Sequence, residues 1–172
     1  MKSNLLTQIL CLAAATAAAL NATATPLQRA DVTAEPAWLV HVDCDALRPT
    51  AIGQYLLSEL DKPEAKGKLG AFEAIFSVDP RKHLHGLTLY STTDGPDDGV
   101  LLIYADFDAE RLITLAKGAN DFQSSTNNGH TIYSWIDDKK KAKNGVKTRV
   151  YAGLQGNRII IFSQRESAVA AG

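Results

Sequence analysis

Apolar and polar residues alternate over residues 38–43, which is the pattern of a half-buried β-strand. The predicted strand divides its side chains between two faces, with Trp38, Val40 and Val42 on one and Leu39, His41 and Asp43 on the other. This is the first regular element that the pattern predicts in the chain.

Two helices are predicted between residues 50 and 76, because the apolar residues there recur every three or four positions. Pro49 and Thr50 open the first helix, which ends near Leu60, and Pro63 begins the second. The apolar stripe of the first consists of Ile52, Tyr55, Leu56 and Leu60. The apolar face of the second consists of Leu69, Phe72, Ile75 and Phe76.

A β-hairpin is predicted next, with strands over residues 85–90 and 100–107 and a Gly- and Asp-rich turn over residues 94–99. Asp108 then has the position of a helix N-cap, with Phe107 and Leu112 placed as a hydrophobic staple around it. This third helix is expected to stop at Gly118.

Short strands follow, over residues 120–124, 131–136, 149–154 and 158–163. The turn signals between them are Asn127-Asn128-Gly129, a lysine-rich loop over residues 139–147, and Gln155-Gly156-Asn157. The order β-α-α-β-β-α-β followed by a meander predicts an α+β fold, with an antiparallel sheet and helices on one face. Its first part matches the split βαβ, or ferredoxin-like, pattern.

The C-terminal residues predict one more helix. The segment Ser163-Gln164-Arg165-Glu166 fits a capping box, and the helix-forming residues after it stop at Gly172. A helix of two turns has little apolar surface to bury. Either this helix is a docked terminal turn, or the chain is the leading part of a longer, repeated protein; the second interpretation is favoured. A single α+β domain is expected over residues 37–172, and under the favoured interpretation it is truncated at its C-terminus.

The N-terminus has the pattern of a cleavable secretory signal. Lys2 supplies a positive charge, residues 5–20 are almost wholly apolar, and Ala22-Thr23-Ala24 fits a cleavage site. The apolar stretch is too short for a typical membrane-spanning helix. We therefore assign residues 1–24 to a signal peptide and residues 25–36 to a flexible leader, and we expect export to the periplasm or the cell exterior.

Composition narrows the classes of function. The chain is 45% hydrophobic, and its 18 basic and 19 acidic residues give a formal charge of −1. This balance argues against nucleic acid as a partner, since that would require a basic face. The lysine-rich loop is interpreted as a solvated connection, because no aromatic residues alternate with its lysines.

Two cysteines, Cys11 and Cys44, are present, and the first is removed with the signal. The mature domain therefore has no internal disulfide. Asp43 and Asp45 flank Cys44 and disfavour its thiolate form, so we interpret Cys44 as a small structural residue.

Four residues form a candidate metal site: His41, Asp43, His83 and His85. Histidines two positions apart on an extended segment can chelate zinc, and Asp45 would add a third side chain to the His41 and Asp43 pair. The site requires that the strands at 38–43 and 85–90 lie side by side. In the alternative interpretation these residues make caps and surface contacts, and no cofactor is bound.

Catalytic motifs are missing from the sequence. It contains no G-x-S-x-G, S-x-x-K or H-E-x-x-H motif and no phosphate-binding glycine loop. An enzyme is therefore the less favoured class.

Residues 38–60, 76–90 and 100–117 resemble a family of exported bacterial proteins of unknown function. The resemblance covers most of the mature chain, and in such relatives the pattern continues further. It implies export and a repeated α+β architecture, and it carries no catalytic or binding residues.

The expected function is that of an exported, soluble, non-catalytic binding or structural module, which presents a sheet face or loops to a protein or cell-surface partner. Two alternatives stay open. One is a small metal- or ligand-binding domain that uses His41, His83 and His85. The other is a secreted hydrolase, which requires a cleft joining Asp43 or Asp106 to one of these histidines.

Overall fold

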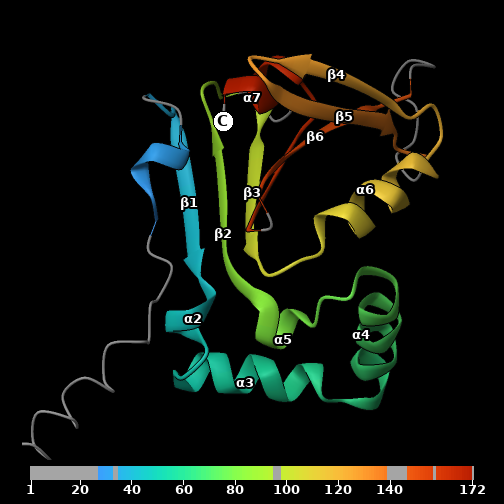
Figure 1. Ribbon diagram of the computed structural model, residues 1–172. Helices are drawn as coiled ribbons and strands as arrows, with labels where there is room; N and C mark the ends of the chain where they lie inside the picture. Colours follow the sequence, from blue (N-terminus) through green and yellow to red (C-terminus); the bar gives the residue numbers. More distant parts are fainter. Residues whose placement is uncertain (1–26, 33–34, 95–97, 139–146, 157, 172) are drawn as a thin grey trace, which may run out of the picture.

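The computed structural model describes residues 27–32, 35–94, 98–138, 147–156 and 158–171. The predicted signal peptide and nearly all of the lysine-rich loop lie outside these residues. The described chain combines one antiparallel sheet with helices, which confirms the predicted α+β class (Figure 1).

Seven strands form the sheet in the order β1-β2-β3-β7-β6-β5-β4, each antiparallel to its neighbours. Their bounds are Trp38–Asp43 (β1), Leu84–Ser91 (β2), Val100–Ala105 (β3), Gln123–Asn127 (β4), His130–Ile136 (β5), Arg149–Gln155 (β6) and Ile159–Ser163 (β7). The chain begins in the predicted β-α-β order, and β1 and β2 are direct antiparallel neighbours. The last strand lies beside β3, so it joins the first three strands to the meander of β4 to β6.

Helices precede, connect and follow the strands, and several begin at a side-chain N-cap. Their bounds are Arg29–Asp31 (η1, a 3-10 helix), Cys44–Leu47 (α2), Ala51–Leu60 (α3), Pro63–Phe76 (α4), Pro80–His83 (α5), Ala109–Lys117 (α6) and Glu166–Ala171 (α7). The predicted N-cap of α6 is confirmed, because the Asp108 carboxylate accepts a hydrogen bond from the Arg111 amide at 3.0 Å. Thr50 caps α3 in the same way, through the Gly53 amide.

The strand register divides the sheet into two faces. Residues that pair across antiparallel strands point to the same side, so each row of paired residues belongs to one face. One row runs His41, Thr88, Leu102, Ile161, Gly153 and Ile132, and we call its side the α7 face. The next row runs Val42, Leu87, Ile103, Ile160 and Leu154, and we call its side the open face.

The α7 face carries the main core. Val169 of α7 is 5% exposed and packs with Ile132 and Ile161, so the terminal helix is docked on the sheet. Burial of a valine side chain stabilises a fold by roughly 1.5–3 kcal/mol. Gly153 allows this close approach, since a Cβ there would lie 3.1 Å from a methyl group of Val169.

The leader also contacts the α7 face. Asp31, in η1, accepts a hydrogen bond from the hydroxyl of Tyr104 at 3.0 Å. Val32 packs against the same core cluster as Val169. Residues 29–32 are thus attached to the sheet in the segment that the sequence assigned to a flexible leader.

The open face is only partly covered. Val40, Val42 and Leu89 project from its β1 and β2 edge and are 58%, 38% and 41% exposed. Figure 1 shows α3 and α4 beyond the end of the sheet where β1 ends and β2 begins, with α6 between α4 and the meander. The helices therefore flank this face and leave apolar surface on it uncovered.

Two further details differ from the sequence prediction. The predicted start of the strand at residue 120 is wrong, because β4 begins three residues later, at Gln123. Asp121 has a φ of 51°, which is incompatible with extended backbone. The short helices α2 and α5 were not predicted, because four residues are too few to show a helical period. Within the described residues, no helix is both long and apolar enough to cross a membrane.

Candidate functional site

His41 and Asp43, two of the four predicted metal ligands, make separate contacts within the protein. Nδ1 of His41 lies 2.8 Å from the hydroxyl of Thr88 on β2. The carboxylate of Asp43 accepts a hydrogen bond from the Ala46 amide at 2.8 Å and so caps α2. His41 therefore contacts the neighbouring strand, and Asp43 is the N-cap of α2.

His83 lies at the end of α5. Its Nδ1 accepts a hydrogen bond from the backbone amide of Asp79, the N-cap residue of the same helix, at 2.9 Å. The Asp79 carboxylate is 2% exposed and accepts hydrogen bonds from the backbone and the guanidinium of Arg81. The ring of His83 therefore stabilises the short helix α5 by accepting a hydrogen bond from its N-cap residue.

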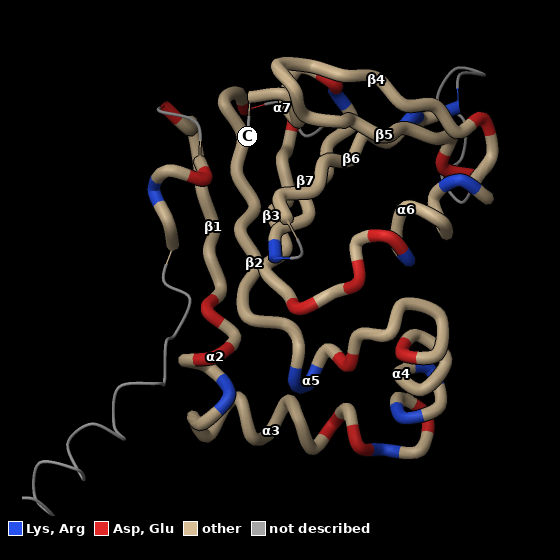
Figure 2. The backbone as a smooth tube through the Cα atoms, viewed as in Figure 1, with Lys and Arg blue, Asp and Glu red and all other residues tan. Residues whose placement is uncertain are grey.

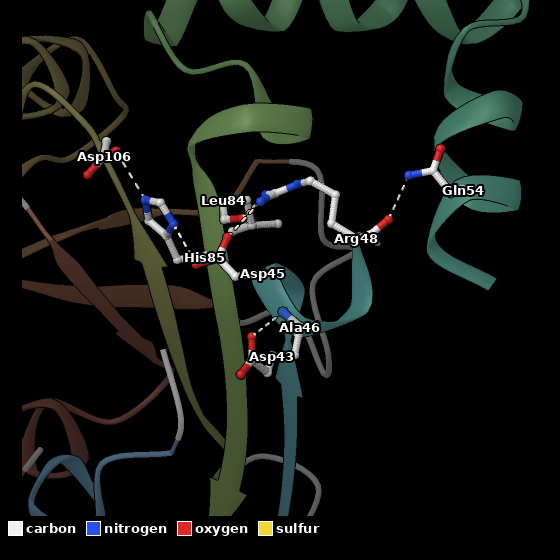
Figure 3. Close-up of polar contacts among 8 residues, drawn as sticks. All are labelled: Asp43, Asp45, Ala46, Arg48, Gln54, Leu84, His85 and Asp106. Atoms are coloured by element: carbon white, nitrogen blue, oxygen red, sulfur yellow. Dashed lines mark hydrogen bonds and ion pairs between the residues drawn. The ribbon is translucent and has the colours of Figure 1, made fainter. Parts of the chain in front are cut away.

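His85 lies between two carboxylates, as Figure 3 shows. Its Nδ1 is 3.0 Å from Oδ2 of Asp45, and its Nε2 is 3.0 Å from Oδ2 of Asp106. Arg48 binds the other oxygen of Asp45 at 2.7 Å and the backbone oxygen of Leu84 at 2.9 Å. The cluster thereby joins α2, β2 and the segment between β3 and α6.

The pKa of His85 is raised above its ordinary value of 6.5. Partial burial is the largest single influence and lowers the pKa, but hydrogen bonds to Asp106 and Asp45, together with their negative charges, outweigh it. A neutral imidazole has one N–H and can donate to one carboxylate only. The two contacts are satisfied together when the ring is protonated, so the cluster favours an imidazolium.

The predicted ligands do not converge on one point. Within the part of the chain that the structure describes, no group of three or more His, Cys, Asp or Glu side chains is arranged to hold a metal ion. Of the five side chains considered, His85 and Asp45 are in contact, whereas His41, Asp43 and His83 each make the separate contacts given above.

Cys44 begins α2 and is half-buried with a free thiol. Burial raises the pKa of this thiol most, Arg48 counteracts that effect, and the negative charges of Asp45 and Asp43 raise it further. The pKa of Cys44 is therefore raised, as its flanking aspartates predict. The thiol form is favoured, which supports a structural interpretation of Cys44.

A large apolar groove lies on the open face, between α4, α6 and the strands. Its volume is about 700 Å³. Of the described residues that line it, none carries a charge, and six are aromatic: Phe72, Phe76, Phe107, Tyr133, Trp135 and Phe162. Phe72 and Ile75 of α4 and Leu115 of α6 remain 40%, 48% and 40% exposed at its walls.

Arg111 holds the two walls of the groove together. Its Nε donates a hydrogen bond to the backbone oxygen of Ile75 at 2.8 Å, and its Nη2 donates to that of Ala74 at 2.6 Å. These carbonyls belong to the last turn of α4, where the helix itself supplies no donor. The sequence identified the apolar faces of both helices but did not indicate that the two faces border this groove.

The chain has no detectable relative among known proteins in any of three comparisons, with family models, curated proteins and solved structures. The resemblance to exported bacterial proteins stays a prediction.

Proposed function

We propose that this chain is an exported, non-catalytic binding module whose ligand is apolar and occupies the groove on the open face. Export is supported by the N-terminal pattern of Lys2, the apolar residues 5–20 and the small residues 22–24. The observation that carries the binding function is an uncharged, aromatic-lined groove of about 700 Å³.

The size and lining of the groove define the ligand chemistry. Sites for small ligands are typically clefts of roughly 300–1,000 Å³, lined mainly by apolar and aromatic side chains. Apolar surface removed from water contributes roughly 25 cal/mol per Å². A charge placed in the groove would lose its hydration without meeting a partner, so the part of the ligand that enters it is uncharged.

The hydrolase alternative is less well supported. It requires a cleft that joins Asp43 or Asp106 to a histidine, and the nearest approach to this is the contact between His85 and Asp106 at 3.0 Å. A general base needs a free lone pair on a ring nitrogen. Both nitrogens of His85 face carboxylates, so the arrangement suits a structural imidazolium better than a base.

Binding of N-phenyl-1-naphthylamine, an uncharged fluorescent probe, tests the proposal. We expect a saturable fluorescence increase with the mature chain. Ala116 lines the groove from α6, and Ala116→Trp should obstruct part of it and weaken binding by about tenfold, or about 1.4 kcal/mol. Thr114→Trp on the exposed side of the same helix is the matched control and should bind as the unmodified chain does. Equal binding by Ala116→Trp, or absence of saturable binding by a folded chain whose groove is open, would refute the proposal.

A further inference from the structure

A second uncovered apolar surface lies on α3. Ile52, Tyr55 and Leu56 are 67%, 63% and 47% exposed. Their spacing of three and four residues places them on one stripe of the helix. A stripe of this kind ordinarily faces a core, but here it faces solvent.

The stripe is also free of charge. Residues 51–58 contain no Lys, Arg, Asp or Glu, and Figure 2 shows no charged position along α3 until its C-terminal end. Exposed apolar patches of this kind mark interaction sites more often than isolated apolar residues do.

Within one copy, α3 is fixed away from the groove. Gly53 packs against the backbone of Leu47 and Arg48 at the end of α2 so closely that no Cβ would fit. At the other end of the helix, Arg81 binds Asp61 at 3.1 Å and ties the C-cap of α3 to α5. The stripe therefore cannot turn into the groove of its own chain without breaking both contacts.

The stripe and the groove complement each other. An amphipathic helix docks into an apolar groove through side chains at positions i, i+3 and i+4, which is the spacing of Ile52, Tyr55 and Leu56. Helix and groove are both uncharged where they would meet, so no charge is buried without a partner. Ten residues give α3 a length of about 15 Å, enough for these anchors to lie along it.

We infer that α3 of one copy of this chain occupies the groove of a second copy. The inference rests on the proposed function, since it names the apolar ligand of the same groove. When each copy inserts its α3 into the other, the two contacts are related by a twofold axis and the assembly closes as a dimer.

Sedimentation velocity of the mature chain over a wide concentration range tests this inference. The unmodified chain should self-associate. Ile52→Lys combined with Leu56→Lys should remain monomeric, and so should Ala116→Trp in the groove. Ala51→Lys combined with Ser58→Lys places the same charges on α3 outside the stripe and should self-associate like the unmodified chain. Circular dichroism of each variant verifies that it is folded.

The outcomes separate the inference from the proposed function. A chain that is monomeric throughout, or self-association unaffected by the stripe and groove variants, would overturn the inference. The fluorescent probe then decides the proposed function by itself: the folded stripe variant has an open groove and should bind the probe. If that variant does not bind it, the proposed function fails as well.

Discussion

Nε2 of His85 lies 3.0 Å from Oδ2 of Asp106, and this contact connects β2 to the segment that leads into α6. The other ring nitrogen lies equally close to Asp45 of α2. Because both contacts are satisfied only by a protonated ring, three segments far apart in the sequence are joined through one titrating side chain.

The first prediction concerns pH. The pKa of His85 is higher in the folded chain than its ordinary value of 6.5, despite the opposing effect of burial. The stabilisation from protonated His85 is therefore complete below pH about 6.5 and is lost as pH rises through the folded-state pKa. The free energy of unfolding of the unmodified chain should exceed that of His85→Gln under mildly acidic conditions, and the difference should shrink above neutrality. Urea denaturation at a series of pH values measures it.

Asp106→Asn provides the control for this experiment. It keeps the shape of the side chain and removes one of the two charges that raise the pKa of His85. The pH dependence should become weaker than in the unmodified chain. A difference between the unmodified chain and His85→Gln that stays constant with pH would contradict the prediction.

The second prediction concerns Gly53. A Cβ at this position would overlap the carbonyl oxygen of Leu47 and lie 2.7 Å from its carbonyl carbon, so the backbone of α2 or α3 would have to move. Gly53→Ala should destabilise the fold by about 2–3 kcal/mol. Gly67→Ala in α4, where a Cβ meets nothing within 4 Å, should instead stabilise it by about 1 kcal/mol. Thermal unfolding of both variants gives the comparison; similar effects of the two substitutions would show that the contact with α2 is not restrictive.

Local signals in the sequence predicted much of the fold. Asp108 and Gly118 defined the ends of α6, and the Asn128-Gly129 signal predicted the turn between β4 and β5, where both residues have positive φ. Alternation predicted the two faces of β1, since His41 lies in the α7-face row and Val42 in the open-face row. These features depend on neighbouring residues, which is why a single sequence reveals them.

The candidate site could be predicted only in part, because its contacts depend on how distant segments pack. Periodicity identified the stripe of α3 but not whether another element covers it, and Ile52 is 67% exposed. The pair of His85 and Asp106 depends on how β2 and β3 align, across 21 residues of chain. His83 and His85 are two positions apart, but His83 is still in α5, so the extended geometry needed for chelation is not present there.

The third prediction concerns the attachment of the leader. The hydroxyl of Tyr104 donates a hydrogen bond to Asp31, and burial is the main cause that raises its pKa to about 12. Tyr104→Phe keeps the ring and removes the donor, which should cost about 1 kcal/mol of stability. Hydrogen exchange at residues 29–32 should become faster. Tyr151→Phe removes a hydroxyl from another strand that packs on the same core and should leave this exchange unchanged. Unchanged exchange in Tyr104→Phe would show that the hydrogen bond to Asp31 does not hold the leader.

The last prediction concerns the wall of the groove. Arg111 bridges α6 to α4 through the backbone oxygens of Ala74 and Ile75. Hydrogen bonds from a charged donor contribute about 1.5–3 kcal/mol, and less where the donor is exposed, as Arg111 is. Arg111→Met keeps most of the apolar stem but removes both hydrogen bonds, so it should lower the free energy of unfolding by about 1 kcal/mol. It should also weaken probe binding severalfold, because the distance between α4 and α6 is then no longer fixed. Lys117→Met removes a positive charge from the last turn of α6 and should change probe binding little. If Arg111→Met binds the probe as tightly as the unmodified chain, packing alone positions the two walls and the bridge has no part in binding.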